Sequence, residues 1–310
     1  MEVGVHLPQI DVLGGHLSSQ RIVDTVAAAR RCGAVALSAN DHFAFPVPWL
    51  DGLVALSAAA TSSGPLDLMT SVTLPALRGP MPVASALSAL SCLCAGRVIA
   101  GVGPGSSALD YSLVGQPFEE RWSRFDAAIV RLRELLRASE PTDPDPRPAA
   151  LAVARSTIPV WVASWGSPAG LRRVVRIGDG WLASAYHQTP EGFSMALGRL
   201  TELCRDRGRP TPPHAVGTMW QWITESSSDA ERVLAALARG VGRDVDELRA
   251  RVCVGSAEHC VELLARYVAA GCQRMHFWPL ADESRQLSLL AEEVLPLVKA
   301  GAASPKPALG

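Results

Sequence analysis

Residues 34–43 read AVALSANDHF, an apolar run that ends in a polar cluster. The apolar part, Ala34 to Ala39, has the length and composition of a buried β-strand. Two further runs end in a comparable way: Leu66 to Thr73 closes on small hydroxyl residues, and Arg97 to Val102 leads into a glycine-rich turn. Parallel α/β barrels build their active sites at the C-terminal ends of their strands. The three segments therefore predict a barrel with a polar site at one end.

The rest of the chain alternates between strand and helix patterns. Five further strands are predicted at Val3–Leu7, Ile158–Ala163, Gly180–Ser184, Ala215–Thr224 and Arg274–Trp278. Amphipathic helices fall between the strands, the longest from Glu119 to Ala138, and a Pro-rich loop follows at residues 140–148. Eight strands alternating with helices predict a single α/β domain over residues 1–299, a (β/α)₈ TIM barrel with an insertion after strand four. Residues 300–310 are expected to form a flexible C-terminal tail.

The composition argues against several classes of function. The chain has 310 residues, 48% of them hydrophobic, which is enough for a large core. Its 29 basic and 30 acidic residues form no basic block, so no nucleic-acid partner is expected. No apolar run reaches the roughly 18 residues that span a bilayer, and Met1 leads straight into a strand without a signal peptide. We therefore expect a cytoplasmic protein without a membrane partner.

The seven cysteines are odd in number and scattered along the chain. They show neither a disulfide framework nor zinc-ligand spacing. The histidines and carboxylates have no spacing typical of a metal site either. No disulfide and no metal are predicted.

Asp41 and His42 are the first candidate catalytic residues. His42 is the only side chain of its cluster that changes charge near neutral pH, and a neighbouring carboxylate can orient an imidazole for acid–base work. We expect Asp41 to play that orienting part. The alternative is that Asp41 caps the following turn and His42 is a packed histidine.

Two strand ends are candidates for contact with a flat ligand. Ser71-Val72-Thr73 places hydroxyls at the end of a buried strand, although ordinary strand termination also explains them. Gly103-Pro104-Gly105-Ser106 permits a close approach of ligand to backbone, although a tight turn explains it equally well. The glycine run lacks the context of a Walker loop or a dinucleotide fingerprint.

The segment Ser164-Trp165-Gly166-Ser167-Pro168 lies between a predicted strand and a predicted helix. Free backbone N–H groups and the two serine hydroxyls make such a turn an anion site. A plain helix N-cap is the alternative. A Ser/Gly turn in the second half of a barrel is, however, a usual place for a cofactor phosphate.

Several large polar or aromatic side chains fall at the same end of the predicted barrel. Those expected to line a substrate pocket are His6, Gln9, Trp49, His187 and Trp220. Each of them, taken alone, is more typical of core packing.

These motifs together resemble the luciferase-like flavin and deazaflavin oxidoreductase superfamily, in particular its branch that uses coenzyme F420. The resemblance rests on the segments at 41–43, 71–73, 96–106, 115–121, 159–164 and 178–181. It implies a TIM barrel that binds a flavin-type ring at the strand ends, with a non-prolyl cis peptide at Ser71–Val72 behind the ring. It also implies a proton-transfer role for His42 and a cofactor-phosphate site at Ser164 to Pro168.

The chain departs from the sugar-phosphate members of this branch. They carry a glutamate where this sequence has Ser106, and the lysines expected around a sugar phosphate are missing. The resemblance therefore implies a less charged small-molecule substrate, such as a biosynthetic intermediate. A homodimer is implied as well, with the Ala- and Leu-rich helices after strands two and three as contact surfaces.

The main hypothesis is an F420-dependent oxidoreductase that transfers a hydride between the deazaflavin and a small organic substrate, with reduction of a C=C or C=N bond favoured. One alternative is a monooxygenase that uses reduced FMN and O₂. The second alternative is a non-catalytic flavin-binding barrel. Binding of F420 or of FMN distinguishes the first two.

Overall fold

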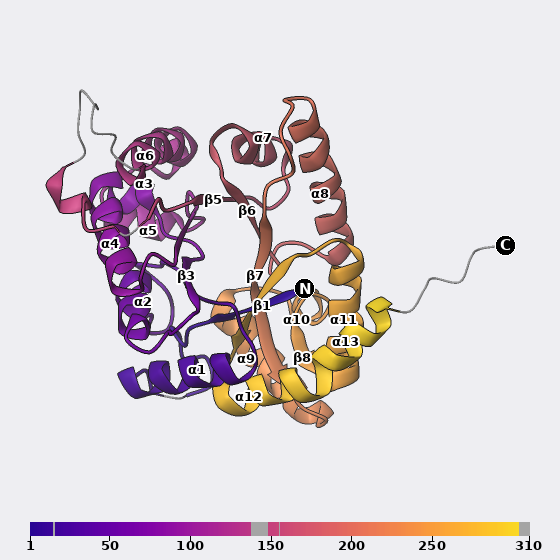
Figure 1. Ribbon diagram of the computed structural model, residues 1–310. Coiled ribbons are helices and arrows are strands. Elements are labelled where there is room, and N and C mark those ends of the chain that lie inside the picture. Colours follow the sequence, from indigo (N-terminus) through magenta and orange to yellow (C-terminus); the bar gives the residue numbers. More distant parts are fainter. Residues whose placement is uncertain (15, 138–147, 155, 304–310) are drawn as a thin grey trace.

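The computed structural model describes the whole chain apart from residues 15, 138–147, 155 and 304–310. Helices surround a central set of strands (Figure 1). The strands are β1 (Glu2–His6), β2 (Ala36–Ala39), β3 (Asp67–Thr70), β4 (Val98–Val102), β5 (Val160–Ala163), β6 (Gly180–Ser184), β7 (His214–Ile223), β8 (Cys253–Gly255) and β9 (Arg274–Pro279).

Eight of these strands close into a parallel barrel. The order runs β1-β2-β3-β4-β5-β6-β7-β9, and β9 pairs with β1 to complete the ring. All these pairings are parallel, as strand–helix–strand connections require. The predicted (β/α)₈ barrel is confirmed, and β6 has the predicted bounds.

The helices cover the outside of the barrel. They are α1 (Ser19–Arg31), α2 (Gly52–Ala60), α3 (Pro75–Arg78), α4 (Pro80–Leu93), α5 (Ala108–Leu113), η1 (Phe118–Glu120), α6 (Arg121–Leu136), η2 (Ala149–Leu151), α7 (Pro168–Ile177), α8 (Pro190–Arg205), α9 (Ser227–Val241), α10 (Val245–Arg249), α11 (Ala257–Ala269), α12 (Glu283–Leu289), η3 (Leu290–Val294) and α13 (Leu295–Ala303).

Some predicted boundaries need correction. The ninth strand, β8, was not predicted; it pairs only with β7, outside the ring. The predicted tail begins too early, because helix α13 continues to Ala303. The insertion after strand four contains α5 and η1 ahead of α6. Most of the predicted loop at 140–148 lies outside the described residues, and the single domain over 1–299 stays a prediction.

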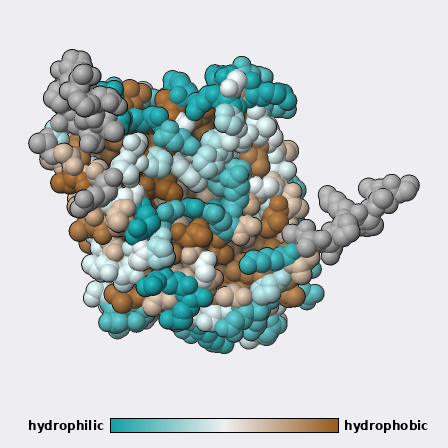
Figure 2. Space-filling model, in the orientation of Figure 1, coloured by the Kyte–Doolittle hydropathy of each residue, from teal (hydrophilic) through white to brown (hydrophobic). Residues whose placement is uncertain are grey.

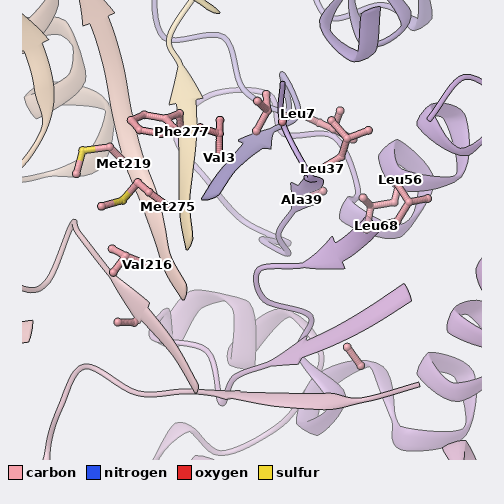
Figure 3. Packing of buried hydrophobic residues seen from close by; sticks show 14 of the residues in the cluster. Val3, Leu7, Leu37, Ala39, Leu56, Leu68, Val216, Met219, Met275 and Phe277 are labelled. Carbon is pink, nitrogen blue, oxygen red and sulfur yellow. The ribbon is translucent and has the colours of Figure 1, made fainter. Parts of the chain in front are cut away.

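Packing between helices and strands supplies most of the core. Figure 3 shows Leu56 of α2 beside Leu37 of β2 and Leu68 of β3, and all three side chains are fully buried. Because side chains alternate across a strand, the residues next to Leu68 face the barrel interior instead. On the outer face of the helices, hydrophobic residues occur in small groups between hydrophilic ones (Figure 2).

Two separate hydrophobic clusters fill the barrel interior and determine where space remains. Met69, Ile99, Trp161 and Leu182 pack together inside β3 to β6. On the opposite side, Trp220 of β7 and Trp278 of β9 stack with ring centroids 4.0 Å apart. This tryptophan pair fills the β7–β9 side of the barrel mouth, so the opening lies over β2 to β6.

Candidate active site

The opening at the C-terminal ends of the strands is a cavity of about 490 Å³. Residues that follow six consecutive strands line it, from His42 after β2 to Thr218 on β7. Its floor includes Val72, Ala163 and Leu182, which belong to the interior cluster beneath. The cavity therefore has the position that the strand-end rule predicts.

His42 lines this cavity and is paired with Asp110, a residue the sequence did not single out. Its Nδ1 lies 3.1 Å from the Oδ2 of Asp110, whose side chain is only 1% exposed. An ionised carboxylate can only accept, so Nδ1 carries the proton and Nε2 is the ring nitrogen left for the cavity. The other carboxylate oxygen accepts from the backbone N–H groups of Phe43 (3.2 Å) and Ala44 (2.7 Å).

Asp110 is held in place by the short helix α5. Ser107 caps this helix by accepting from the Asp110 N–H at 3.0 Å. The neighbouring Tyr111 is buried and donates its hydroxyl to the Pro104 carbonyl at 2.5 Å. Helix α5 therefore fixes both the carboxylate behind His42 and the glycine-rich turn of residues 103–105.

The predicted pairing of Asp41 with His42 is wrong. Asp41 points to the other side of the segment, where it accepts from the Thr73 hydroxyl (2.7 Å) and from Arg78 Nε (2.7 Å) and Nη2 (2.8 Å). Arg78 also donates to Asp51, the N-cap of α2. Burial alone would lower the pKa of Arg78. The two carboxylates raise this pKa by more than burial lowers it, so the guanidinium stays charged. Asp41 is thus an anchor of the segment, although it is also among the residues that line the cavity.

The peptide bond Ser71–Val72 is cis, as the resemblance implies. Val72 meets the turn after β4 closely, because a Cβ on Gly103 would lie 2.7 Å from Val72 Cγ2. Ser71, Val72, Gly103, Pro104, Gly105 and Ser106 all line the cavity. Thr73 does not: it is 1% exposed and turned toward Asp41. Val72 therefore packs directly against Gly103, and both residues line the cavity.

The turn after β5 borders the cavity and is held by two serine side chains. Ser167 caps α7 by accepting from the Gly170 N–H at 3.1 Å, and Ser164 accepts from the Gly166 N–H at 3.2 Å. Ser164, Trp165 and Ser167 line the cavity. Gly166 has a φ of +84° and lies behind the turn, where a Cβ would come 2.5 Å from Gln188 Nε2. Ser167 is therefore the N-cap of α7, and an anion site at this turn stays a prediction.

Of the five predicted pocket residues, only His187 lines the cavity. His6 and Trp220 belong to the aromatic packing around Trp278, with His6 stacked on that ring at 3.4 Å. Burial lowers the pKa of His6 to about 3. Gln9 is fully buried and holds the backbone of Asn40 and Leu50.

Trp49 occupies the space between the aromatic packing and the active site. Its ring meets His42 edge-on at 4.6 Å and Trp278 at 5.8 Å. Trp49 therefore packs against the imidazole and does not line the cavity. The prediction is wrong for His6, Gln9, Trp49 and Trp220 because aromatic packing fills that half of the mouth.

Thr218 is a further lining residue that the sequence did not indicate. It has a φ of +58°, where a β-bulge shifts the pairing of β7 with β9 between Val216 and Met219. Bulges of this kind re-aim side chains next to active sites. Phe118, Arg121 and Trp122, at the start of α6, complete the wall beyond β4.

Comparison with known proteins agrees with this geometry. A family model described as luciferase-like monooxygenase matches residues 1–247. The chain belongs to this family.

Among the described residues, no group of three or more His, Cys, Asp or Glu side chains is placed to hold a metal ion. None of the described helices is both long and apolar enough to cross a bilayer.

Two similar curated proteins are named F420-dependent glucose-6-phosphate dehydrogenase. The one from Kineococcus radiotolerans is 31% identical over 322 residues, covering 90% of this chain and 93% of its own. The one from Beutenbergia cavernae is 29% identical over 292 residues, 84% of each chain. The luciferase-like chain described here thus matches both relatives over most of their length.

Several solved structures share the fold. Monooxygenase RslO1 from Streptomyces bottropensis has a TM-score of 0.79 at 19% identity, with 96% of this chain and 99% of that chain covered. An F420-dependent secondary alcohol dehydrogenase, in complex with an F420–acetone adduct, has a TM-score of 0.79 at 17% identity, with coverage of 96% and 98%.

Proposed function

We propose that this luciferase-like protein is a coenzyme F420-dependent oxidoreductase that transfers a hydride between the deazaflavin and a small organic substrate. The observation that carries the proposal is one cavity lined by the imidazole of His42, which Asp110 holds, by Val72 and Gly103, and by the serine-rich turn before α7. The cofactor assignment is supported by the F420-dependent relatives at 31% and 29% identity. Reduction of a C=C or C=N bond is the direction we favour, as a prediction.

The residues present fit a deazaflavin cofactor. Val72 packs against Gly103 in a contact that a side chain on residue 103 would break, and a flat ring would lie against these two residues. Ser164 and Ser167, with the first turn of α7, offer hydroxyl and N–H groups to a phosphate. The tail of the cofactor would extend toward Arg121, the one guanidinium among the described lining residues.

His42 performs the proton transfer in this proposal. F420, when bound, supplies the carrier for the hydride. During oxidation the bare Nε2 of His42 takes a proton from the substrate, while Nδ1–H stays bonded to Asp110. During reduction the reverse holds: the ring protonated at both nitrogens gives its Nε2 proton to the substrate and returns to the Nδ1–H form. Asp110 keeps the ring in this tautomer, and Trp49 packs against its edge. Holding the reacting groups in contact is the main contribution of such a site.

Glucose 6-phosphate is not the substrate we propose, although the relatives are named for it. Ser106 lines the cavity at the position where the resemblance implies a glutamate. No lysine lies among the described lining residues. A less charged substrate fits this cavity better.

Titration of the purified protein with F420 and with FMN, followed by fluorescence, tests the proposal. We expect saturable binding of F420, and saturable binding of FMN alone would overturn it. His42→Ala should abolish hydride transfer while leaving F420 affinity within about threefold, since the imidazole faces the substrate. Ser167→Ala, in the serine-rich turn, should instead weaken F420 binding.

A monooxygenase that uses reduced FMN is the second candidate, favoured by the fold shared with RslO1. The same titration separates the two, because it distinguishes the cofactors. A non-catalytic barrel is disfavoured by the His42–Asp110 pair, which a binding role does not require.

We further propose that the protein is a cytoplasmic homodimer that binds neither nucleic acid nor membrane. Val54 on α2 and Leu93 on α4 are 67% and 64% exposed on helices with many alanine and leucine residues, which supports a contact surface there. Light scattering after gel filtration would measure the mass, and Val54→Asp should shift it to that of one chain.

A further inference from the structure

The cavity contains a second histidine, His187, across the barrel from His42. His42 follows β2 and His187 follows β6, and these two strands lie four places apart in the eight-stranded ring. Both side chains line the same cavity. A ligand that spans the cavity can therefore contact both imidazoles.

The ring of His187 is fixed by its neighbours. It stacks on Trp165 with centroids 3.7 Å apart and 12° between the planes, and meets Tyr186 edge-on at 4.6 Å. Its Nδ1 lies 3.1 Å from the hydroxyl of Ser184, which also lines the cavity. Nε2 is left as the nitrogen available to a ligand.

Two arginines lie near His187 but turn away from the cavity. Arg243 and Arg251 both pair with Glu247, at 2.9 and 2.7 Å, and Arg243 covers the Tyr186 ring at 4.3 Å. Burial, and then the charges of these two arginines, lower the pKa of His187 to about 3. The imidazole is therefore neutral at physiological pH and offers one donor and one acceptor.

The rest of this side of the cavity is uncharged as well. Ser184 and Thr218 contribute hydroxyl groups from β6 and β7. Arg121 lies beyond β4, where it packs on the Phe118 ring at 4.0 Å and donates to the Phe118 carbonyl. The sequence has two lysines, Lys299 and Lys306, both near its C-terminal end.

We propose that His187 determines substrate specificity by selecting an uncharged hydrogen-bonding group, such as a hydroxyl, carbonyl or amide, and by rejecting a phosphate or carboxylate at that position. A phosphate beside this imidazole gives up its hydration and requires charged donors or a helix N-terminus in return. The cofactor phosphate would have the start of α7, whereas Nε2 of His187 offers a substrate phosphate neither of these. A neutral imidazole with a serine hydroxyl satisfies a neutral polar group instead. This inference rests on the proposed function, since it names the substrate class of the same site.

The test compares glucose 6-phosphate with glucose as ligands of the F420-loaded protein by calorimetry. The wild type and His187→Gln should show no preference for the phosphate. His187→Lys should gain a preference of about 10- to 100-fold, the effect of one hydrogen bond to a charged group. A comparable preference in the wild type, or no gain in the lysine variant, overturns the proposal.

Two further measurements keep the outcomes distinct. F420 affinity is measured first, so a failure of the proposed function shows as lost cofactor binding and not as altered phosphate preference. Imidazole ¹⁵N NMR of the unsubstituted protein does not depend on the folding of a variant. It should show His187 neutral near pH 7, and a protonated His187 there would contradict the inference.

Discussion

Replacing Asp110 with asparagine tests how His42 is prepared for proton transfer. The amide oxygen of the new side chain can keep accepting from the backbone N–H groups of Phe43 and Ala44, which Asp110 Oδ1 accepts at 3.2 and 2.7 Å. The amide NH₂ then faces His42 Nδ1 in place of the oxygen that lies 3.1 Å away. Nδ1 must accept instead of donate, so the proton moves to Nε2 and the tautomer is inverted.

The size of this effect follows from the one interaction that changes. A hydrogen bond to a charged group is worth about 1.5–3 kcal/mol, which corresponds to a tautomer preference of roughly 10- to 150-fold. Loss of correctly placed acid–base catalysis lowers the rate by about 10²–10⁴-fold. We therefore expect a fall of that order in hydride transfer, with F420 affinity unchanged because the loop keeps both backbone contacts.

Imidazole ¹⁵N shifts report the tautomer directly, and stopped-flow absorbance of F420 reports hydride transfer. Asp110→Ala serves as the contrast, since it also releases the two backbone N–H groups and should loosen the loop. An Asp110→Asn protein that keeps the wild-type His42 shifts and the wild-type rate would refute the role given to this pair.

Three further predictions concern the framework of the site. Gly103→Ala should cost about 1–3 kcal/mol of unfolding free energy and weaken F420 binding, because the new Cβ would lie 2.7 Å from Val72 Cγ2 and displace Val72; urea denaturation and fluorescence titration measure both. Arg78→Gln should cost about 3–5 kcal/mol in urea denaturation, since it leaves a buried carboxylate without its partner. His6 and His276 have pKa values lowered to about 3 by burial, so the unfolded chain binds more protons between about pH 3 and 6.5. Stability should be full above that window and fall inside it by up to about 2.7 kcal/mol per pH unit from these two histidines and by about 1.4 kcal/mol more from His187, whose pKa is also lowered to about 3, as acid titration of unfolding would show.

Each of these has a matched control in the chain. Gly198 lies inside α8, and nothing lies within 4 Å of the place that a Cβ would take there, so Gly198→Ala should stabilise by roughly 0.5–1 kcal/mol. Arg131 is 55% exposed in its pair with Glu134, and Arg131→Gln should change stability by less than about 1 kcal/mol. The exposed His16 should leave the acid profile unchanged when replaced by glutamine. Equal effects in variant and control would contradict the stated cause.

The barrel could be predicted because its strands are short apolar runs bounded by glycine, proline and polar residues. Gly180–Ser184 is predicted with the observed bounds for this reason. Strand β8 was not predicted because its three residues, Cys253 to Gly255, are too few to show a hydrophobic pattern. α5 escaped in the same way, with six residues in a segment that looked like a loop.

The positions of His42 and Ser164 followed from the strand-end rule, but their partners did not. Asp41 and His42 are adjacent in an extended segment, where consecutive side chains point to opposite sides, so the nearest carboxylate in sequence was the wrong one. Asp110 is 68 residues away from His42 and meets it only after the chain has folded around β3 and β4. Side-chain pairs of this separation depend on tertiary packing, which composition and spacing do not record.

The segment that carries His42 is tied together at its base. Gln9 bonds Asn40 at one end and Leu50 at the other, and Arg78 joins Asp41 to Asp51 one residue further along. Residues 42–49 therefore form a loop whose two ends are held together by these hydrogen bonds and ion pairs. Residues 46–48 can therefore be lengthened or replaced to reshape access to the site, provided that these contacts and those of Phe43 and Ala44 with Asp110 are kept.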